Sequence, residues 1–194
     1  MIILAYRFIK RFGDVVLAAA GLVVLSPVFF VLALAVKIGG KGPVLFRQKR
    51  IGRKKKPFTM LKFRTMRMDS PKDTPTHLLE NSGEYITRTG EFLRKTSLDE
   101  LPQLLNILVG HMSIIGPRPA LWNQDDLIKE RDKYGANDIR PGLTGWAQVN
   151  GRDELSISAK AEFDGEYVRR MGFLLDCKCF AMTVVKVIRG EGVK

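Results

Sequence analysis

The chain has 194 residues, 45% of them hydrophobic, which is enough for one domain with a sizeable core. The formal net charge of +12 is uneven, because eleven Lys or Arg and no acid lie between residues 41 and 67, and such a cluster suits phosphates of nucleic acid or of anionic lipid headgroups. Cys177 and Cys179 are two residues apart and far from His77 and His111, so neither a disulfide between them nor a zinc site is expected.

An uncharged run of 22 residues, 15–36, follows the basic residues Arg7, Lys10 and Arg11. As a straight helix it would be about 33 Å long, enough to cross a bilayer. A secretory signal is disfavoured, because the segment after its candidate cleavage site is too basic to translocate easily. A spanning helix is opposed by the positive-inside rule, because positive charge flanks both ends.

Ser26 and Pro27 stand at the centre of this run. Pro27 lacks an N–H and clashes with the carbonyl of Val23, which predicts a kink. The Ser26 hydroxyl can satisfy part of the loosened backbone in lipid. A helix that bends here and returns to the same face would keep both basic flanks in the cytoplasm. These residues alone leave the re-entrant and spanning arrangements open.

The next segment has the pattern of a β-hairpin. Strands are expected over residues 42–48 and 57–64, with a turn around Gly52, so that the hairpin carries much of the basic cluster at a membrane surface. Residues 68–90 are rich in Pro, Ser, Thr and Asp and predict a surface excursion. A short helical piece is expected over residues 91–95.

Two adjacent carboxylates, Asp99 and Glu100, precede an apolar helical run. Ser97 and Glu100 are spaced as a capping box, which would start a helix at Ser97, whereas Pro102 favours Asp99 as the cap. Either register puts Asp99 at a helix mouth, where the dipole favours an ionised carboxylate that could act as a nucleophile. Acidic residues also favour first turns for structural reasons alone.

Arg118 lies between two prolines, Pro117 and Pro119, which limit the directions of its guanidinium and suit a bidentate phosphate clamp. Four Gly or Pro residues surround Trp146 in the segment 140–152, a composition typical of loops that approach ligands. Helices are expected over 121–134 (solvated), 154–170 and 172–187. The last is amphipathic and suits either a membrane interface or the domain core. His111 is interpreted as structural.

Four motifs follow one another along the chain: Lys62-Phe63-Arg64-Thr65-Met66, Ser97-Leu98-Asp99-Glu100-Leu101-Pro102-Gln103, Gly116-Pro117-Arg118-Pro119 and Arg140-Pro141-Gly142-Leu143-Thr144-Gly145-Trp146. With them the chain resembles, over almost its whole length, the bacterial sugar transferases, which are monotopic polyprenol-phosphate phosphoglycosyl transferases. It looks like the minimal catalytic form, without the extra N-terminal membrane domain of larger members.

The resemblance implies a mixed α/β, helix-rich fold with a β-hairpin and several surface or interfacial amphipathic helices. Residues 1–38 would form a re-entrant membrane helix hairpin broken at Ser26-Pro27. Residues 39–194 would form a catalytic domain at the cytoplasmic face of the cell inner membrane. The expected partners are a nucleotide-sugar donor, a polyprenol phosphate acceptor and anionic lipid headgroups, but not nucleic acid.

The implied reaction transfers a phospho-sugar from a nucleotide diphosphate sugar, usually a UDP-sugar, to a polyprenol phosphate such as undecaprenyl phosphate, in glycoconjugate or exopolysaccharide assembly. By resemblance, Asp99 is the nucleophile, forms a covalent intermediate and meets Mg²⁺, and Glu100 is its essential neighbour. The remaining implied substrate-binding residues are Lys62, Arg94, Pro117, Arg118, Arg152 and Asp164.

Two other hypotheses come from different classes of protein. A non-enzymatic, membrane-attached basic protein that binds anionic lipid or nucleic acid would explain the basic cluster and the apolar run. It would give no role to Asp99, Glu100 or Arg118. A secreted basic protein would require the N-terminal run to be removed. Release of nucleoside monophosphate from a nucleotide sugar distinguishes the enzyme from both.

Overall fold

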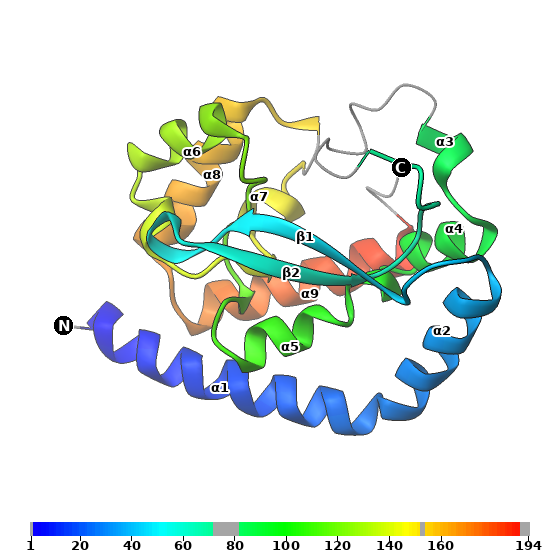
Figure 1. The fold of residues 1–194 in the computed structure, drawn as a ribbon. Helices are drawn as coiled ribbons and strands as arrows, with labels where there is room; N and C mark the ends of the chain where they lie inside the picture. Colours follow the sequence, from blue (N-terminus) through cyan, green and yellow to red (C-terminus); the bar gives the residue numbers. More distant parts are fainter. Residues whose placement is uncertain (1, 72–81, 152–153, 191–194) are drawn as a thin grey trace.

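A computed structural model describes residues 2–71, 82–151 and 154–190 of the chain (Figure 1). Helices surround a central β-hairpin, so the predicted mixed, helix-rich fold with a hairpin is confirmed. The helices are α1 (Ile2–Val24), α2 (Ser26–Ile38), α3 (Ser82–Tyr85), α4 (Arg88–Lys95), α5 (Gln103–Leu108), α6 (Asp125–Asp132), α7 (Trp146–Val149), α8 (Ile157–Arg170) and α9 (Phe173–Arg189). The strands are β1 (Leu45–Ile51), β2 (Pro57–Phe63), β3 (Ser113–Ile115) and β4 (Gly142–Thr144).

The N-terminal helix breaks where the sequence predicts. Helices α1 and α2 meet at a bend of 65°, with Pro27 in the first turn of α2. The Ser26 hydroxyl donates a 2.8 Å hydrogen bond to the Val23 carbonyl, the acceptor that Pro27 cannot reach. Among the described residues no single helix is long and apolar enough to cross a membrane, whereas this bent pair passes that test together.

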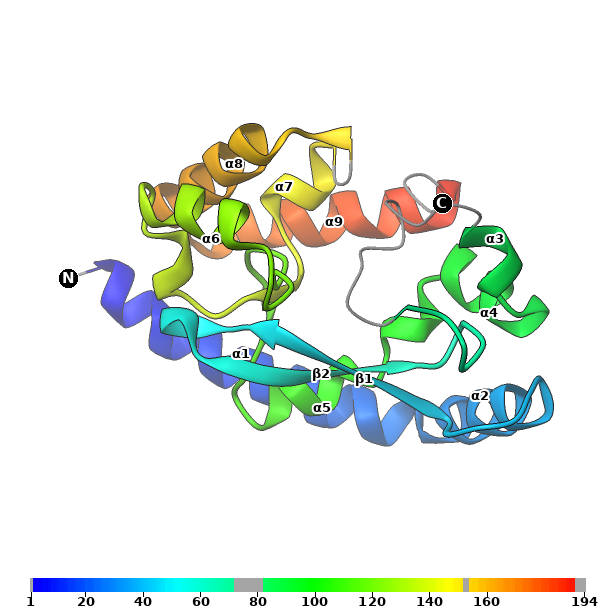
Figure 2. The same cartoon turned by 45° about the horizontal axis from the view of Figure 1, so that its top comes forward.

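Helix α1 lies along one side of the protein, next to α5 (Figure 2). Polar side chains fasten it there. Lys10 Nζ lies 2.6 Å from Asp176 Oδ2 on α9. Arg11 donates to the last carbonyls of α5 at 2.7 and 3.0 Å. Asp14, which is 5% exposed, accepts the Ile114 N–H at 3.0 Å. Lys10 and Arg11, two of the three basic residues that precede the apolar run, therefore form contacts within the protein.

The hairpin pairs β1 and β2 antiparallel, with Leu45 opposite Phe63 and Ile51 opposite Pro57. The second strand lies where it was expected. The first was predicted over 42–48 but begins at Leu45, after Gly42 at φ 122° and a proline without an N–H, and continues to Ile51. Strand β2 packs against α5, whose Asn106 Oδ1 accepts from Leu61 N at 2.9 Å. The Asn106 amide also donates to a carbonyl of β2.

A second, parallel pair of strands was not predicted. Strand β3 runs beside β4, with Ser113 opposite Gly142 and Ile115 opposite Thr144. Each strand has three residues, too few for a readable alternation. The backbones around this pair are very close, since a Cβ on Gly145 would lie 2.0 Å from the Gly116 oxygen. The pair brings the segment that contains Arg118 against residues 140–145.

The C-terminal helices lie close to their predicted positions. Ser156 caps α8 by accepting the Ala159 N–H at 3.2 Å. Helix α9 packs across β3 and β4 with Cys179 fully buried, while Cys177 is exposed, so the two cysteines do not pair. Its outer face exposes six apolar side chains: Phe173, Leu174, Phe180, Val184, Val185 and Ile188.

Two helical predictions need correction. The segment 121–134 is a shorter helix, α6, and its Arg131 is 5% exposed rather than solvated. The piece expected over 91–95 begins earlier, at Arg88, because Thr87 caps it by accepting the Gly90 N–H at 2.9 Å. The excursion over 68–90 contains helix α3, and part of it lies outside the described residues.

Candidate active site

The two carboxylates occupy a 3-10 turn, Leu98–Glu100, between α4 and α5. Both predicted registers for a helix starting at Ser97 or Asp99 are wrong. Ser97 has a left-handed backbone, φ 57°, and its side chain makes no capping bond. Pro102 has no N–H for an α-type bond to Leu98, so the turn closes through Leu101 N and the α-helix begins only at Gln103.

Lys62, at the end of β2, bridges the two acids. Its Nζ lies 2.6 Å from Glu100 Oε1 and 3.6 Å from Asp99 Oδ2. All three side chains are mostly buried, with 16%, 14% and 11% of their surfaces exposed for Lys62, Glu100 and Asp99. The ammonium therefore neutralises part of the charge that two adjacent carboxylates would otherwise concentrate.

Arg94 approaches the same acids from helix α4. Its Nε donates a 2.9 Å hydrogen bond to Thr65 Oγ1, which orients the guanidinium. Helix α4 can pack this closely against the Thr65 backbone only because residue 90 is glycine. A Cβ there would lie 2.0 Å from the Thr65 carbonyl oxygen. Burial lowers the pKa of Arg94, while the negative charge of Asp99 raises it.

Arg118 reaches the site from the loop after β3. Its Nη2 lies 3.3 Å from Glu100 Oε1, so Glu100 contacts both Lys62 and Arg118. The side chain is 30% exposed and so more accessible than that of Lys62, which also contacts Glu100. A guanidinium in that position can accompany a carboxylate and still meet a phosphate from solution.

The groups around Asp99 shift the pKa of its carboxyl in opposite directions. Burial raises the pKa of its carboxyl, Lys62 lowers it, Glu100 raises it, and Arg94 and Arg118 lower it. The net direction is upward. The sequence predicted that a helix dipole would keep Asp99 ionised, but the α-helix starts four residues later. Nearby cations are the groups that favour the ionised form, and they do not fully offset the burial that disfavours it.

Asp164 is not open to the site in the way that the resemblance implies. It is 1% exposed on α8 and pairs with Arg131, whose Nη2 lies 2.6 Å from Asp164 Oδ2. Burial raises the pKa of Asp164, and Arg131 lowers it. Arg131 in turn donates to the Arg118 carbonyl at 2.9 Å. Asp164 is thus connected to Arg118 through one intervening side chain.

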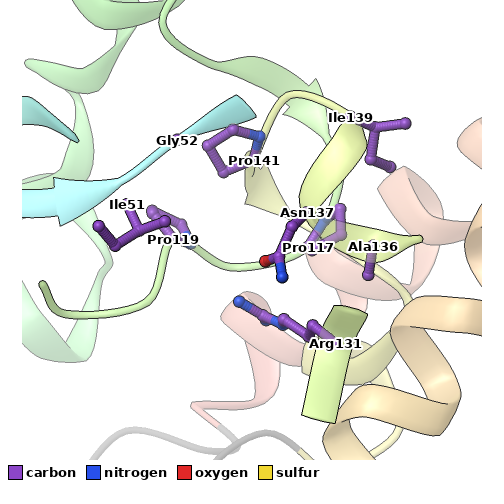
Figure 3. A pocket seen from close by; sticks show the side chains of 9 residues that line it. All are labelled: Ile51, Gly52, Pro117, Pro119, Arg131, Ala136, Asn137, Ile139 and Pro141. Carbon is purple, nitrogen blue, oxygen red and sulfur yellow. The ribbon is translucent and has the colours of Figure 1, made fainter. Parts of the chain in front are cut away.

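Pro117 lines a small cavity behind the Arg118 segment (Figure 3). The cavity, with Pro119, Arg131 and Asn137 also in its wall, measures about 10 Å³, room for roughly one water molecule. It is too small for a substrate. Arg152, which the resemblance places among the substrate-binding residues, lies outside the described residues.

A larger cavity of about 300 Å³ opens at the end of α2 rather than at Asp99. Arg64 lines it and donates to the carbonyls of Val36 at 3.0 Å and Gly40 at 2.7 Å. This arginine therefore caps the carboxyl end of the bent helix pair. The motif at residues 62–66 thus connects the acids, through Lys62, with the end of that pair.

Two carboxylates side by side are donor groups of the kind that Mg²⁺ accepts. Mg²⁺ is usually held by one or two carboxylates together with substrate phosphate oxygens. Asp99 and Glu100 offer such carboxylates. Within the described ranges no group of three or more His, Cys, Asp or Glu gathers, so a metal cage made by protein alone is not present there.

Three residues near the site were not singled out from the sequence: Arg64, Thr65 and Arg131. The first two stand inside the motif at 62–66, so that motif already pointed to them. Nothing in the sequence marked Arg131 as a buried residue, because a basic residue in a highly charged helix is expected to face solvent.

Comparisons with known proteins place the chain among named relatives. The sequence model of the bacterial sugar transferases matches residues 5–190. A UDP-glucose:undecaprenyl-phosphate glucose-1-phosphate transferase of Escherichia coli is 42% identical over 93% of this chain, which spans 40% of that relative. An uncharacterized sugar transferase of Bacillus subtilis is also 42% identical, with 96% of this chain and 90% of the relative covered. A UDP-N-acetylgalactosamine-undecaprenyl-phosphate N-acetylgalactosaminephosphotransferase of Aeromonas hydrophila is 34% identical, and the chain spans 46% of it.

Proposed function

The chain belongs to the bacterial sugar transferase family, and from this membership we propose that it transfers a phospho-sugar from a UDP-sugar to undecaprenyl phosphate. The products would be undecaprenyl diphosphate-sugar and UMP. The observation that carries the proposal is the Asp99–Glu100 pair, buried beside Lys62 and within reach of Arg118. Two relatives are named for this type of reaction with different sugars, so the donor sugar is left to experiment.

The cations around the acids support a substrate that carries a diphosphate. A carboxylate that approaches a diphosphate meets like charge, and fixed positive groups must offset it. Lys62 already lies against both acids, and the exposed part of Arg118 can form a planar fork with phosphoryl oxygens.

In the proposed mechanism a carboxylate oxygen of Asp99 attacks the phosphorus that bears the sugar. The bond from that phosphorus to the bridging oxygen breaks, and UMP leaves with the bridging oxygen. The phosphate oxygen of the lipid acceptor then attacks the same phosphorus and releases the Asp99 carboxylate. A covalent route of this kind lets one site serve a water-soluble donor and a lipid acceptor in turn.

Glu100 has a supporting role in this scheme. It is the closer partner of Lys62 and the contact of Arg118, so it holds two cations next to Asp99. Adjacent residues in a 3-10 turn point about 120° apart, which makes it difficult for both acids to attack one phosphorus. Asp99 would hold Mg²⁺ together with the diphosphate oxygens. Bound Mg²⁺ supplies positive charge that weakens the repulsion between carboxylate and diphosphate.

The proposed location is the cytoplasmic face of the inner membrane. The bent pair α1–α2 would enter the bilayer and return to the same side, with the Ser26–Val23 hydrogen bond satisfying a carbonyl at its deepest point. The exposed apolar face of α9 suits the membrane interface. The acceptor phosphate would then reach Asp99 from the lipid surface.

A screen of donors tests the reaction. The detergent-solubilised full chain is mixed with Mg²⁺, undecaprenyl phosphate and one of several nucleotide sugars, beginning with UDP-glucose and UDP-N-acetylgalactosamine, and UMP is measured. Release of UMP that depends on the lipid supports the proposal. Absence of release with every donor, together with retained binding to anionic vesicles, would favour a non-enzymatic lipid-binding protein.

A further inference from the structure

Three donors from separate parts of the fold hold three successive carbonyls of the Pro117-Arg118-Pro119 segment. The Gly142 N–H donates to the Pro117 carbonyl at 2.8 Å. Arg131 Nη1 donates to the Arg118 carbonyl at 2.9 Å, and Arg50 Nη1 donates to the Pro119 carbonyl, also at 2.9 Å. Two of these three residues are prolines and have no backbone N–H. The backbone of this segment can therefore form hydrogen bonds mainly through its carbonyl oxygens.

Each of the two arginines is itself held in place. Arg131 binds Asp164 Oδ2 through both Nε, at 2.8 Å, and Nη2, at 2.6 Å, and this leaves Nη1 directed at the Arg118 carbonyl. Arg50 binds the Gln48 Oε1 through Nε and Nη2 at 3.0 and 2.6 Å, which leaves its Nη1 for the Pro119 carbonyl. The two arginines therefore use the same geometry on two neighbouring carbonyls.

Burial makes these bonds costly to lose, most of all at Arg131, because Arg50 is only half-buried. Arg131 and Asp164 are 5% and 1% exposed, and Gln48 is 9% exposed. An arginine in such surroundings without its partners would leave a charge and a carbonyl unsatisfied. Lysine cannot replace it, because a single ammonium cannot point two donors at one carboxylate and a third at a carbonyl in a fixed plane. The arrangement depends on the guanidinium shape.

We infer that Arg131 and Arg50 are positioning residues that fix the backbone of Arg118, and that Asp164 acts on the reaction only through Arg131. This inference rests on the proposed function, because Arg118 is the group that would meet the diphosphate. A long side chain such as that of Arg118 binds phosphate more tightly when its backbone is already fixed. Less conformational freedom is then lost when the guanidinium binds.

The first test follows the backbone and needs no substrate. In Arg131→Lys and in Arg50→Lys, amide hydrogen exchange of the full-length protein is measured by mass spectrometry over residues 116–121. We expect exchange in this segment to become at least tenfold faster, with exchange in β2 unchanged. Arg170→Lys is the matched control, because Arg170 forms an exposed ion pair with Glu166 on α8, the helix that carries Asp164. Unchanged exchange at 116–121 in both test variants would overturn the inference.

The second test measures coupling to Arg118. Arg131→Lys and Arg50→Lys should each slow UMP release from the active donor by at least tenfold, and by less than about threefold when Arg118 is already alanine. Losses that multiply fully in the double variants would mean that these arginines act independently of Arg118, and would overturn the inference. If Arg131→Lys does not fold, the same comparison made with Arg50→Lys, with and without Arg118→Ala, decides whether the inference holds. If the wild type releases no UMP from any donor, the proposed function fails, while the exchange measurement still decides the backbone role.

Discussion

The Lys62 ammonium lies closer to Glu100 than to Asp99: its Nζ is 2.6 Å from Glu100 Oε1 and 3.6 Å from Asp99 Oδ2. Glu100 thus anchors the cation, and Asp99 keeps a carboxylate that is less committed to a partner. This division separates the acid that organises positive charge from the acid that is proposed to attack phosphorus.

Replacing Lys62 with Met should remove the cation and leave two buried carboxylates side by side. We expect UMP release to fall at least 100-fold, in line with the loss of one charge-stabilising donor. Stability should fall by on the order of 3 kcal/mol, as when one member of a buried ion pair is removed. Lys95→Met is the control, because Lys95 makes only an exposed pair with Glu91. Activity within threefold of wild type would exclude the assigned role of Lys62.

Asp99 should limit stability at neutral pH. Because its folded-state pKa is raised from 3.8, mainly by burial, the folded protein holds the proton more tightly than the unfolded chain does. Stability therefore falls as pH rises above 3.8 until the folded carboxyl has also ionised. Asp99→Asn, which cannot ionise, should have the higher melting temperature at pH 7 in EDTA, and the difference should shrink as pH approaches 3.8.

The matched variant for that experiment is Asp125→Asn, which alters an exposed carboxylate at the start of α6. Its melting temperature should follow wild type over the same range of pH. A wild-type protein more stable than Asp99→Asn at pH 7 would show that the cations around Asp99 outweigh its burial.

The sequence predicted the hairpin and the helix break, because strand alternation and the Ser26-Pro27 pair can be read without tertiary contacts. The placing of Lys62 and Arg94 near the acids came only from the family resemblance, since neither residue has a local signal for it. The predicted start of α5 was wrong because Ser97 has a left-handed backbone and Pro102 removes one donor. The parallel pair β3–β4 and the buried Arg131–Asp164 pair depend on long-range contacts, which no local pattern encodes.

Arg118 should act through its planar fork rather than through its charge alone. Arg118→Lys keeps the positive charge but cannot bind a phosphate in a bidentate way, so we expect UMP release to fall at least tenfold. Attachment to vesicles, measured by flotation, should not change. Near wild-type turnover in this variant would assign Arg118 a structural role only.

The bent pair α1–α2 should keep both of its ends on one face of the membrane. Phe12→Cys and Lys41→Cys, each in a background with Cys177 and Cys179 replaced, report the two ends, since both side chains are exposed. In inside-out vesicles an impermeant thiol reagent should label both, and in right-side-out vesicles neither. Labelling from opposite faces would mean that the pair spans the bilayer.

Pro27→Ala should weaken the bend. Alanine restores an N–H that can donate to the Val23 carbonyl, the group that now accepts from the Ser26 hydroxyl. The same two cysteine reporters should then show partial labelling from opposite faces. Labelling identical to that of the parent would mean that the contacts of α1 and α2 with the rest of the protein set the bend without help from proline.

The most direct measurement of the proposed mechanism is the intact mass of the protein after mixing with Mg²⁺ and the active UDP-sugar, without undecaprenyl phosphate. Asp99 should carry a phospho-sugar, and about one equivalent of UMP per active enzyme should appear, as a covalent intermediate requires. Asp99→Asn should form no adduct and release no UMP, while folding as the melting experiment predicts. If UMP appears only with the lipid acceptor and no adduct maps to Asp99, transfer is direct and Asp99 is not the nucleophile.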